Sequence, residues 1–369
     1  MPNSQLINKA LPAHEQSVAR SQLFMQRALQ LARLGAGAVS PNPMVGCVIV
    51  HEGKIIGEGW HQKYGETHAE VNAVNSVLDK SILSESEIYV TLEPCSHFGK
   101  TPPCADLLIK YQVKKVYVCN HDSNPLVGGK GIEKLRQAGI EVETGLLENE
   151  GRTLNKRFFT FIEKERPYII LKWAETADGF IAKSNYEAVQ ISNLLSRRFV
   201  HKMRSDEDAI MVGKNTAIHD NPTLDTRFWT GKNAIRVVID KQLNLPQNLH
   251  LFDNSQTTIC FNCLIDKQIE NNIFIKIPLN ISIVEFIIKE LYQRKVQSVI
   301  IEGGAILLQS FIDLRLWDEA IILKSRTILT KGISAPKVGG YENKIENLGD
   351  NFVFYKKMNG YLPDYTTHE

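Results

Sequence analysis

The amino-acid sequence predicts a two-domain protein of the α/β class. Its 369 residues suit two domains at roughly 100–200 residues each. Apolar runs that read as strands alternate with segments of helical spacing in both halves of the chain. Such alternation is typical of α/β layers around a largely parallel sheet. A highly charged stretch near the middle, ending at Pro167, separates the two halves.

The first half begins with a polar segment, 1–21, that we interpret as a flexible leader, with helix from about Gln22. A domain over 22–150 follows. Its predicted strands are 44–51, 54–61, 88–93, 115–119 and 140–145, and the first two are joined by a tight Glu52-Gly53 turn. Its predicted helices are 22–34, 69–78, 105–111 and 132–138.

The second half begins after a linker predicted at 151–166 and forms a second domain over 167–369. Its predicted strands are 168–174, 178–182, 208–213, 235–240, 257–261, 273–277, 298–302 and 318–324. Its predicted helices are 193–204, 283–295 and 305–315.

Composition and charge argue against nucleic acid and membranes as binding partners. The chain is 43% hydrophobic and 23% charged, with a formal net charge of +2, so no strong field points to nucleic acid. No apolar run approaches the ~18–20 residues of a membrane span, and the first residues lack the apolar core of a secretory signal. We therefore expect a cytoplasmic protein that acts on a small molecule, with no nucleic acid and no membrane as partner.

The six cysteines fall into two groups. Cys47, Cys119 and Cys260 lie in apolar runs, which favours buried thiols. Cys260 and Cys263 form a C-x-x-C without a second pair at zinc spacing, so we interpret that motif as structural. Cys95 and Cys104 stand apart from these because they follow a predicted strand and precede a predicted helix.

His68, Cys95 and Cys104 predict a catalytic zinc site. One histidine and two cysteines satisfy three of the four tetrahedral positions of zinc and leave the fourth for water. Zinc lowers the pKa of such a water, and Glu70, two residues after His68, can carry the proton to the leaving ammonia. This H-x-E then P-C pattern is typical of zinc nucleobase deaminases, although here eight residues rather than two separate the cysteines.

Four stretches resemble the bifunctional riboflavin biosynthesis deaminase-reductases: PNPMVGCVIV (41–50), HAE (68–70), TLEPCSHFGKTPPC (91–104) and NPLVGGKG (124–131). The long cysteine loop is a feature of that family. The resemblance implies a cytidine-deaminase-like three-layer α/β/α domain with one zinc ion per chain. It also implies hydrolytic deamination of a diaminopyrimidinone that carries a ribosylamine 5′-phosphate.

The phosphate of such a substrate needs donors near the zinc site. The candidates are Asn42, His97, Lys100, Asn124 and Lys130. Each alone is compatible with an ordinary surface or turn position, and together they would flank one pocket mouth. We expect Lys100 to contact the phosphate, in which case replacing it would raise the KM of the deaminase.

The second half resembles the reductase domain of the same family over 171–182, 204–227 and 300–311, which implies a dihydrofolate-reductase-like α/β fold and NADPH as cofactor. The residues alone show a strand that runs into Gly303-Gly304 and a helix, where backbone amides can approach a phosphate. This is not a Rossmann G-x-G-x-x-G. By resemblance, the NADPH side uses Thr216, Asp220 and Gly304, and the substrate side uses Arg204, Leu224, Arg227 and Glu302. Lys172 and Asp178 match the pattern near the nicotinamide.

Three positions depart from the family pattern in the reductase half. Gln190 stands where the family usually has a tryptophan that packs on the cofactor, and Ala188 stands where a serine contacts the substrate. Glu175 occupies a cofactor-side position where a small residue is common. These departures put the affinity for the cofactor, rather than the fold, in question.

Three other interpretations stay open on the sequence alone. The chain could be a single-activity zinc deaminase for free bases or nucleic acid, with a regulatory tail. It could hold a structural zinc, whose fourth ligand would be His97 or Cys47. The second half could be a non-catalytic scaffold, a reading that the changes at 188 and 190 allow. The family resemblance also implies a homo-oligomer formed through the reductase domain.

Overall fold

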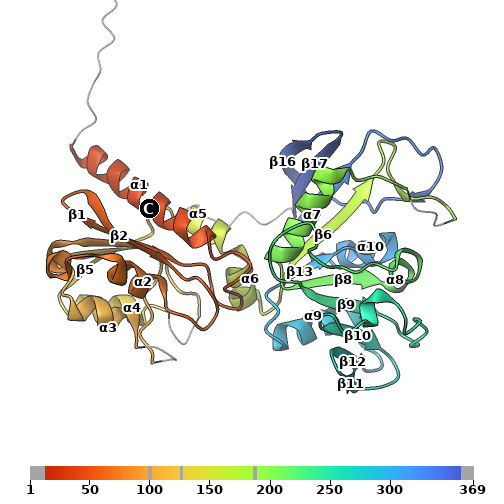
Figure 1. Cartoon of the computed structure of the whole chain (residues 1–369), viewed down its shortest axis with the longest axis horizontal. Coiled ribbons are helices and arrows are strands. Elements are labelled where there is room, and N and C mark those ends of the chain that lie inside the picture. The colour runs from red at the N-terminus through yellow and green to blue at the C-terminus, as the bar shows by residue number, and fades with distance from the viewer. Residues whose placement is uncertain (1–12, 99–101, 125–127, 186–188, 359–369) are drawn as a thin grey trace, which may run out of the picture. The chain divides into compact units, whose positions relative to one another are not determined.

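The computed structural model of the chain describes residues 13–98, 102–124, 128–185 and 189–358. The chain divides into two compact units, with the boundary between Phe159 and Thr160. Each unit has its own sheet with helices packed against it (Figure 1). Both units are therefore α/β, as the sequence predicted.

The first unit is built on a five-stranded sheet in the order β2-β1-β3-β4-β5. β1 pairs antiparallel with β2 and with β3, whereas β3, β4 and β5 are parallel. The strands are β1 (Gly46–His51), β2 (Lys54–Trp60), β3 (Glu87–Leu92), β4 (Lys115–Asn120) and β5 (Glu141–Thr144). The helices are α1 (Ala13–Arg33), α2 (Ala69–Ser76), η1 (Lys80–Glu85), α3 (Cys104–Lys110), α4 (Lys130–Gln137) and α5 (Glu148–Leu154).

The side chains of β1 alternate between the two faces of this sheet, and each face is covered by helices. Val48 and Val50 pack with Met25 of α1, on the face that α5 also covers. Cys47 and Ile49 pack with Ala73 of α2, on the face shared by α3 and α4 (Figure 1). The predicted three-layer α/β/α arrangement is confirmed.

The second unit is built on a ten-stranded sheet in the order β11-β12-β10-β9-β8-β13-β6-β14-β17-β16. The strands from β12 to β14 in that order run parallel, and the edges are antiparallel. The first six strands in chain order are β6 (Tyr168–Glu175), β7 (Phe180–Ala182), β8 (Ala209–Gly213), β9 (Ile235–Ile239), β10 (Thr258–Asn262) and β11 (Lys267–Ile269). The others are β12 (Asn272–Lys276), β13 (Ser298–Ile301), β14 (Glu319–Lys324), β15 (Ile333–Ser334), β16 (Tyr341–Leu348) and β17 (Asn351–Lys357). β7 and β15 lie outside the ten-stranded sheet and pair with each other in a sheet of two strands.

Helices cover both faces of the central strands of this second sheet. α9 (Ile283–Gln293) and α10 (Ala305–Asp313) pack against one face. α7 (Leu194–Asp206), α8 (Lys214–Asp220) and the short η2 (His250–Phe252) pack against the other. The carboxyl ends of β6, β8, β9 and β13 lie along one edge, which is where open parallel sheets place their ligands.

Helix α1 begins earlier than predicted, at Ala13 rather than about Gln22, so the leader predicted at 1–21 is in part helical. Residues 15–20 are exposed, and for that reason they carry no apolar pattern that marks a helix. Helix-favouring residues and Glu15 in the first turn are consistent with the earlier start.

The predicted linker 151–166 is mostly helical, since it contains the end of α5 and all of α6 (Lys156–Lys164). Its side chains are integrated into the units on either side. Asn155 is buried. Its Oδ1 accepts from the N–H of Met44 at 2.9 Å, and its Nδ2 donates to the C=O of Met44 at 2.8 Å. This segment therefore fixes the loop that carries Asn42.

Candidate active sites

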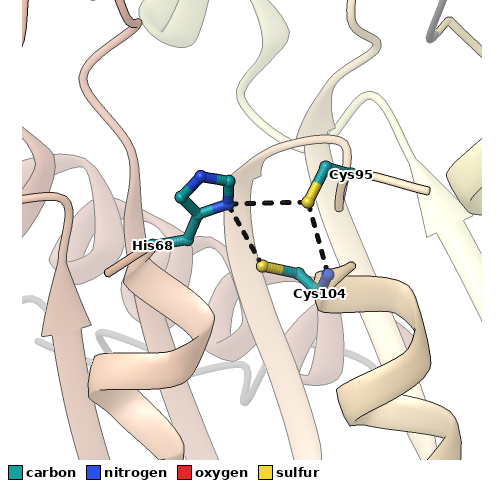
Figure 2. A group of neighbouring side chains, drawn as sticks. All are labelled: His68, Cys95 and Cys104. Carbon is teal, nitrogen blue, oxygen red and sulfur yellow. Dashed lines mark hydrogen bonds between the residues drawn. The ribbon is translucent and has the colours of Figure 1, made fainter. Parts of the chain in front are cut away.

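His68, Cys95 and Cys104 come together in the first unit (Figure 2). His68 is the N-cap of α2, Cys95 lies in the loop after β3, and Cys104 is the first residue of α3. The Nδ1 atom of His68 lies 3.5 Å from Sγ of Cys95 and 3.3 Å from Sγ of Cys104. The backbone N–H of Cys104 donates to Sγ of Cys95 at 3.3 Å.

This donor set fits a zinc ion. The three ligand atoms lie within 4.8 Å of one another, and one imidazole with two thiols is a donor combination that zinc prefers. A hydrogen bond with the side chain of Cys104 lowers the pKa of the Cys95 thiol, which favours the thiolate that a metal requires. Among the described residues, no fourth histidine, cysteine or carboxylate joins the group, so one coordination position stays open.

Glu70 lies beside the three ligands, in the first turn of α2. Only 3% of the residue is exposed. Burial raises its pKa to about 7, and the charge of Cys95 contributes in the same direction. A carboxyl group with such a pKa is suited to exchange protons near neutral pH.

The second unit contains a cavity of about 950 Å³ at the carboxyl ends of its parallel strands. The predicted residues that line it are Lys172, Gln190, Arg204, Thr216, Asp220, Leu224, Glu302 and Gly304. Its volume is within the range of small-molecule and cofactor sites.

Glu302, the first residue after β13, is a buried carboxylate between two cations of this cavity. Arg204 donates to it through Nε at 3.0 Å and Nη2 at 2.8 Å, and Nζ of Lys172 lies 3.6 Å away. Burial would raise the pKa of Glu302, but the charges of Arg204 and Lys172 hold it at about 2. Burial and the nearby Arg204 lower the pKa of Lys172. Glu302 is therefore an anion that orients both cations.

Two helices begin at the same cavity. Gly304 is the N-cap of α10, and its N–H donates to Oγ1 of Thr216 in α8 at 3.0 Å. A Cβ on Gly303 would approach the side chain of Leu307 to 2.6 Å and the backbone N of Gly213 to 3.3 Å, so glycine permits this close packing. The first N–H groups of α10 have no partner within the helix, and such groups favour an anion such as a phosphate.

Comparisons with known proteins match both units. Residues 18–120 match the cytidine and deoxycytidylate deaminase zinc-binding region, and residues 167–339 match the RibD C-terminal domain. The riboflavin biosynthesis protein RibD of Aquifex aeolicus is 39% identical over 349 residues, which are 90% of this chain and 97% of that protein. The chain belongs to the RibD family.

Solved structures of RibD proteins have the same two-unit fold. The deaminase/reductase of Thermotoga maritima matches with a TM-score of 0.85 and 34% identity, over 93% of this chain and 99% of that one. Acinetobacter baumannii RibD matches with a TM-score of 0.83 and 32% identity, over 92% and 99%. As a RibD-family protein, the chain is an enzyme of riboflavin biosynthesis with a deaminase unit and a dihydrofolate-reductase-like reductase unit. The scaffold interpretation of the second half is not favoured.

His61 is a site residue that sequence reasoning missed in this RibD chain. Its Nδ1 donates to the carbonyl of Thr67 at 3.1 Å, and its Nε2 accepts from Asn42 at 3.1 Å. Its ring lies 5.7 Å, edge to face, from that of His68. Burial lowers the pKa of His61, which agrees with the neutral tautomer that these two bonds require. A single histidine after a strand gives little signal in a sequence, whereas its neighbour Asn42 was predicted.

The other predicted residues of the deaminase unit lie around the loop after β4. His97 is exposed, and its charge acts on Asp122, whose pKa is raised by burial. The N–H of Asn124 donates to the Asp122 carboxylate at 2.8 Å, and Lys130 is the first residue of α4. Lys100 lies outside the described residues. Asp122 was not predicted, because an Asp near a strand end is common in loops.

Some residues that were predicted to contact the cofactor or the substrate do not line the cavity in the described part of the reductase unit. Glu175 accepts a hydrogen bond from Trp173 and pairs with Lys324. Arg227 is half exposed and pairs with Asp225 at 2.6 Å. The carboxylate of Asp178 accepts hydrogen bonds from the backbone N–H groups of Leu329 and Thr330. Ala188 lies outside the described residues.

Among the described residues, no helix combines the length and the apolar character that crossing a bilayer requires. The cysteines expected to be buried thiols, Cys47, Cys119 and Cys260, are buried and free, and Cys263 is free as well.

Proposed function

We propose that this chain first deaminates 2,5-diamino-6-(5-phosphoribosylamino)pyrimidin-4-one and then reduces the ribosyl group of the product to a ribityl chain with NADPH. One zinc ion acts in the first unit as part of a hydrolase site, and NADPH is bound in the second as part of an oxidoreductase site. The observation that carries the proposal is the pairing, on one chain, of an open three-ligand metal site beside a buried Glu70 with a cavity built around Glu302.

In the deaminase unit, His68, Cys95 and Cys104 would hold the zinc ion, which would supply a water molecule of lowered pKa for attack on the ring carbon. Glu70 would take the two protons of that water in turn, passing the first to the ring nitrogen and the second to the departing amine. A C–O bond forms, the C–N bond breaks, and ammonia leaves. Because burial raises the pKa of Glu70 to about 7, its carboxyl group can both take up and release protons near neutral pH.

The ring and the phosphate of the substrate are held by the residues around this site. Asn42 is oriented by His61, whose ring lies 5.7 Å from that of the metal ligand His68, and it is suited to bond the pyrimidine. His97, Lys100, Asn124 and Lys130 are the proposed donors for the 5′-phosphate. Replacing Lys100 with alanine should raise the KM of deamination with little change in kcat.

In the reductase unit, the amides near Gly304, with Thr216 and Asp220, would hold NADPH, which would supply a hydride to the ring-opened ribose carbon. Gln190, which lines the cavity, is assigned to the nicotinamide side. Arg204 binds the substrate phosphate, and Leu224 packs on the substrate. Lys172 supplies the proton that completes the reduction, since burial lowers its pKa and Glu302 orients it.

The order of the two reactions is tested by withholding NADPH. With the diamino substrate alone, we expect ammonia and the deaminated ribosyl compound, identified by mass spectrometry. When NADPH is added, the ribityl product should appear. A reduced product that still carries both amino groups would contradict this order.

A single change at Gln190 tests the cofactor side of the cavity. Replacing it with tryptophan should lower the Kd of NADPH by about threefold to tenfold, because the contact of an aromatic ring with the cofactor contributes roughly 0.5–1.5 kcal/mol to the binding free energy. The measurement is titration calorimetry with NADP⁺ and NADPH. Unchanged or weaker binding would show that Gln190 does not face the cofactor.

Two further expectations rest on family membership. We infer that the chain acts in the cytoplasm and forms a homo-oligomer through its reductase unit. Sedimentation of the full chain, with and without NADPH, tests the second of these.

A further inference from the structure

Glu93, between β3 and the metal ligand Cys95, has a fully buried side chain that accepts from four backbone amides, and its Oε2 also lies 3.8 Å from Nδ1 of the exposed His121. Its Oε1 accepts from the N–H of Gly131 at 2.9 Å and of Ile132 at 3.3 Å. Its Oε2 accepts from the N–H of Gly129 at 2.9 Å and of Asp122 at 3.3 Å. Four bonds to one carboxylate thus reach Asp122, in the loop after β4, and the start of α4 at 129–132.

The loop needs this acceptor at the start of α4. The first amides of a helix have no partner within the helix, and the N-cap residue here, Gly129, has no side chain to offer. The negative charge of Glu93 is favourable at this end of the helix. A buried carboxylate also requires such donors, because an unsatisfied charge away from water is costly.

The loop lies in direct contact with the segment that carries Cys95. A Cβ on Gly131 would lie 1.9 Å from the carbonyl oxygen of Pro94, so no larger residue fits without displacing α4. At the other end of the loop, the charges of Glu93, His97 and Cys95 all act on Asp122. The N–H of Asp122 donates to Glu93, two residues before Cys95, and the N–H of Asn124 donates to Asp122, so Glu93 sets the position of both residues.

We propose that Glu93 is a positioning residue of the deaminase reaction. It touches neither the metal nor the reacting atoms. It fixes Asp122 and Asn124, and the start of α4, as the substrate-binding rim of the site. This inference rests on the proposed function insofar as the rim binds the phosphoribosyl pyrimidine. In the motif Glu93-Pro94-Cys95, the acidic residue would then serve to position the substrate-binding rim. Gly129 and Gly131 would serve the same purpose.

The test replaces Glu93 with glutamine, which keeps the shape but turns two acceptor positions into donors that face amide N–H groups. We expect the KM for the diamino substrate to rise roughly tenfold or more, whereas kcat falls less than about threefold and zinc remains at one per chain. NADPH oxidation with the deaminated substrate should be unchanged, and the retained zinc, together with the circular dichroism spectrum, reports in the same sample that the deaminase unit is folded.

Two other variants complete the design. Gly131→Ala displaces the same loop with the carboxylate intact, and we expect a similar rise in KM. Glu133→Gln is the matched control, because Glu133 is exposed on α4 and bonds only Gln137 among the contacts described. It should behave as wild type.

The outcomes separate the alternatives. If KM is unchanged in both Glu93→Gln and Gly131→Ala while zinc is retained, Glu93 is merely structural and the inference is wrong. If zinc is lost from Glu93→Gln, Glu93 acts through Cys95 rather than through the rim, which also overturns it. Should Glu93→Gln fail to fold, Gly131→Ala decides alone. If wild type itself releases no ammonia, the proposed function fails instead.

Discussion

Replacing Glu70 with glutamine should abolish ammonia release from the diamino substrate and leave the zinc in place. Glutamine keeps the size of the side chain but cannot take up and return a proton. General acid–base catalysis typically contributes about 10²–10⁴-fold, and Glu70 acts in several proton transfers, so we expect kcat to fall by at least roughly 10³-fold. Ammonia release and metal content, measured on one preparation, provide the test.

The matched control for Glu70→Gln is Glu66→Gln, at an exposed position just before the metal ligand. It should retain full deamination. Substantial activity in Glu70→Gln would show that another group moves the protons. Loss of zinc from this variant would show instead that Glu70 acts mainly by maintaining the metal site.

Replacing Glu302 with glutamine should abolish NADPH oxidation and destabilise the reductase unit. The substitution leaves the charges of Arg204 and Lys172 buried without their counter-ion. Removing one partner of a buried ion pair typically costs about 3–5 kcal/mol. We expect the turnover of the deaminated substrate to fall by at least roughly 10²-fold and the thermal transition of this unit to move to lower temperature.

Deamination should persist in Glu302→Gln, because the metal site belongs to the other unit. Replacing Glu290, which pairs with Arg294 on the solvent side of α9, is the control for loss of an ion pair without an effect on the cavity. Near-normal NADPH oxidation in Glu302→Gln would contradict the role given to this carboxylate. The same would follow if Lys172→Met retained full activity.

The metal site could be predicted from the sequence because its residues carry the chemistry in their side chains and in their spacing. His68, Glu70, Cys95 and Cys104 belong to two short motifs, and the structure brings them together. Glu302 and Arg204 were predicted by family resemblance, but their mutual pairing needed the fold, because 97 residues separate them in the chain.

Other parts could not be predicted because their partners are backbone groups far along the chain. Glu93 bonds amides of 122–132, and Asn155 bonds Met44. Buried Arg236 likewise donates to the carbonyls of Thr223 and His250, which fixes the loop that carries Leu224. None of these residues has a spacing pattern that predicts its partner.

The fold was predicted where strands and helices are apolar and periodic, and was missed where they are exposed. The start of α1 is one example. The edge hairpin of β16 and β17 is another, since the described side chains of β16 are all exposed or half-buried and only two of β17 are buried, so polar residues obscure the pattern. The Gly349-Asp350 turn between these strands was the available signal.

The most direct test of two sequential sites on one chain is NADPH oxidation by wild type and Glu70→Gln with two substrates. We predict that wild type consumes NADPH with both the diamino and the deaminated compound. Glu70→Gln should consume it only with the deaminated compound. Oxidation by Glu70→Gln with the diamino substrate would contradict the account, because reduction would then not depend on prior deamination.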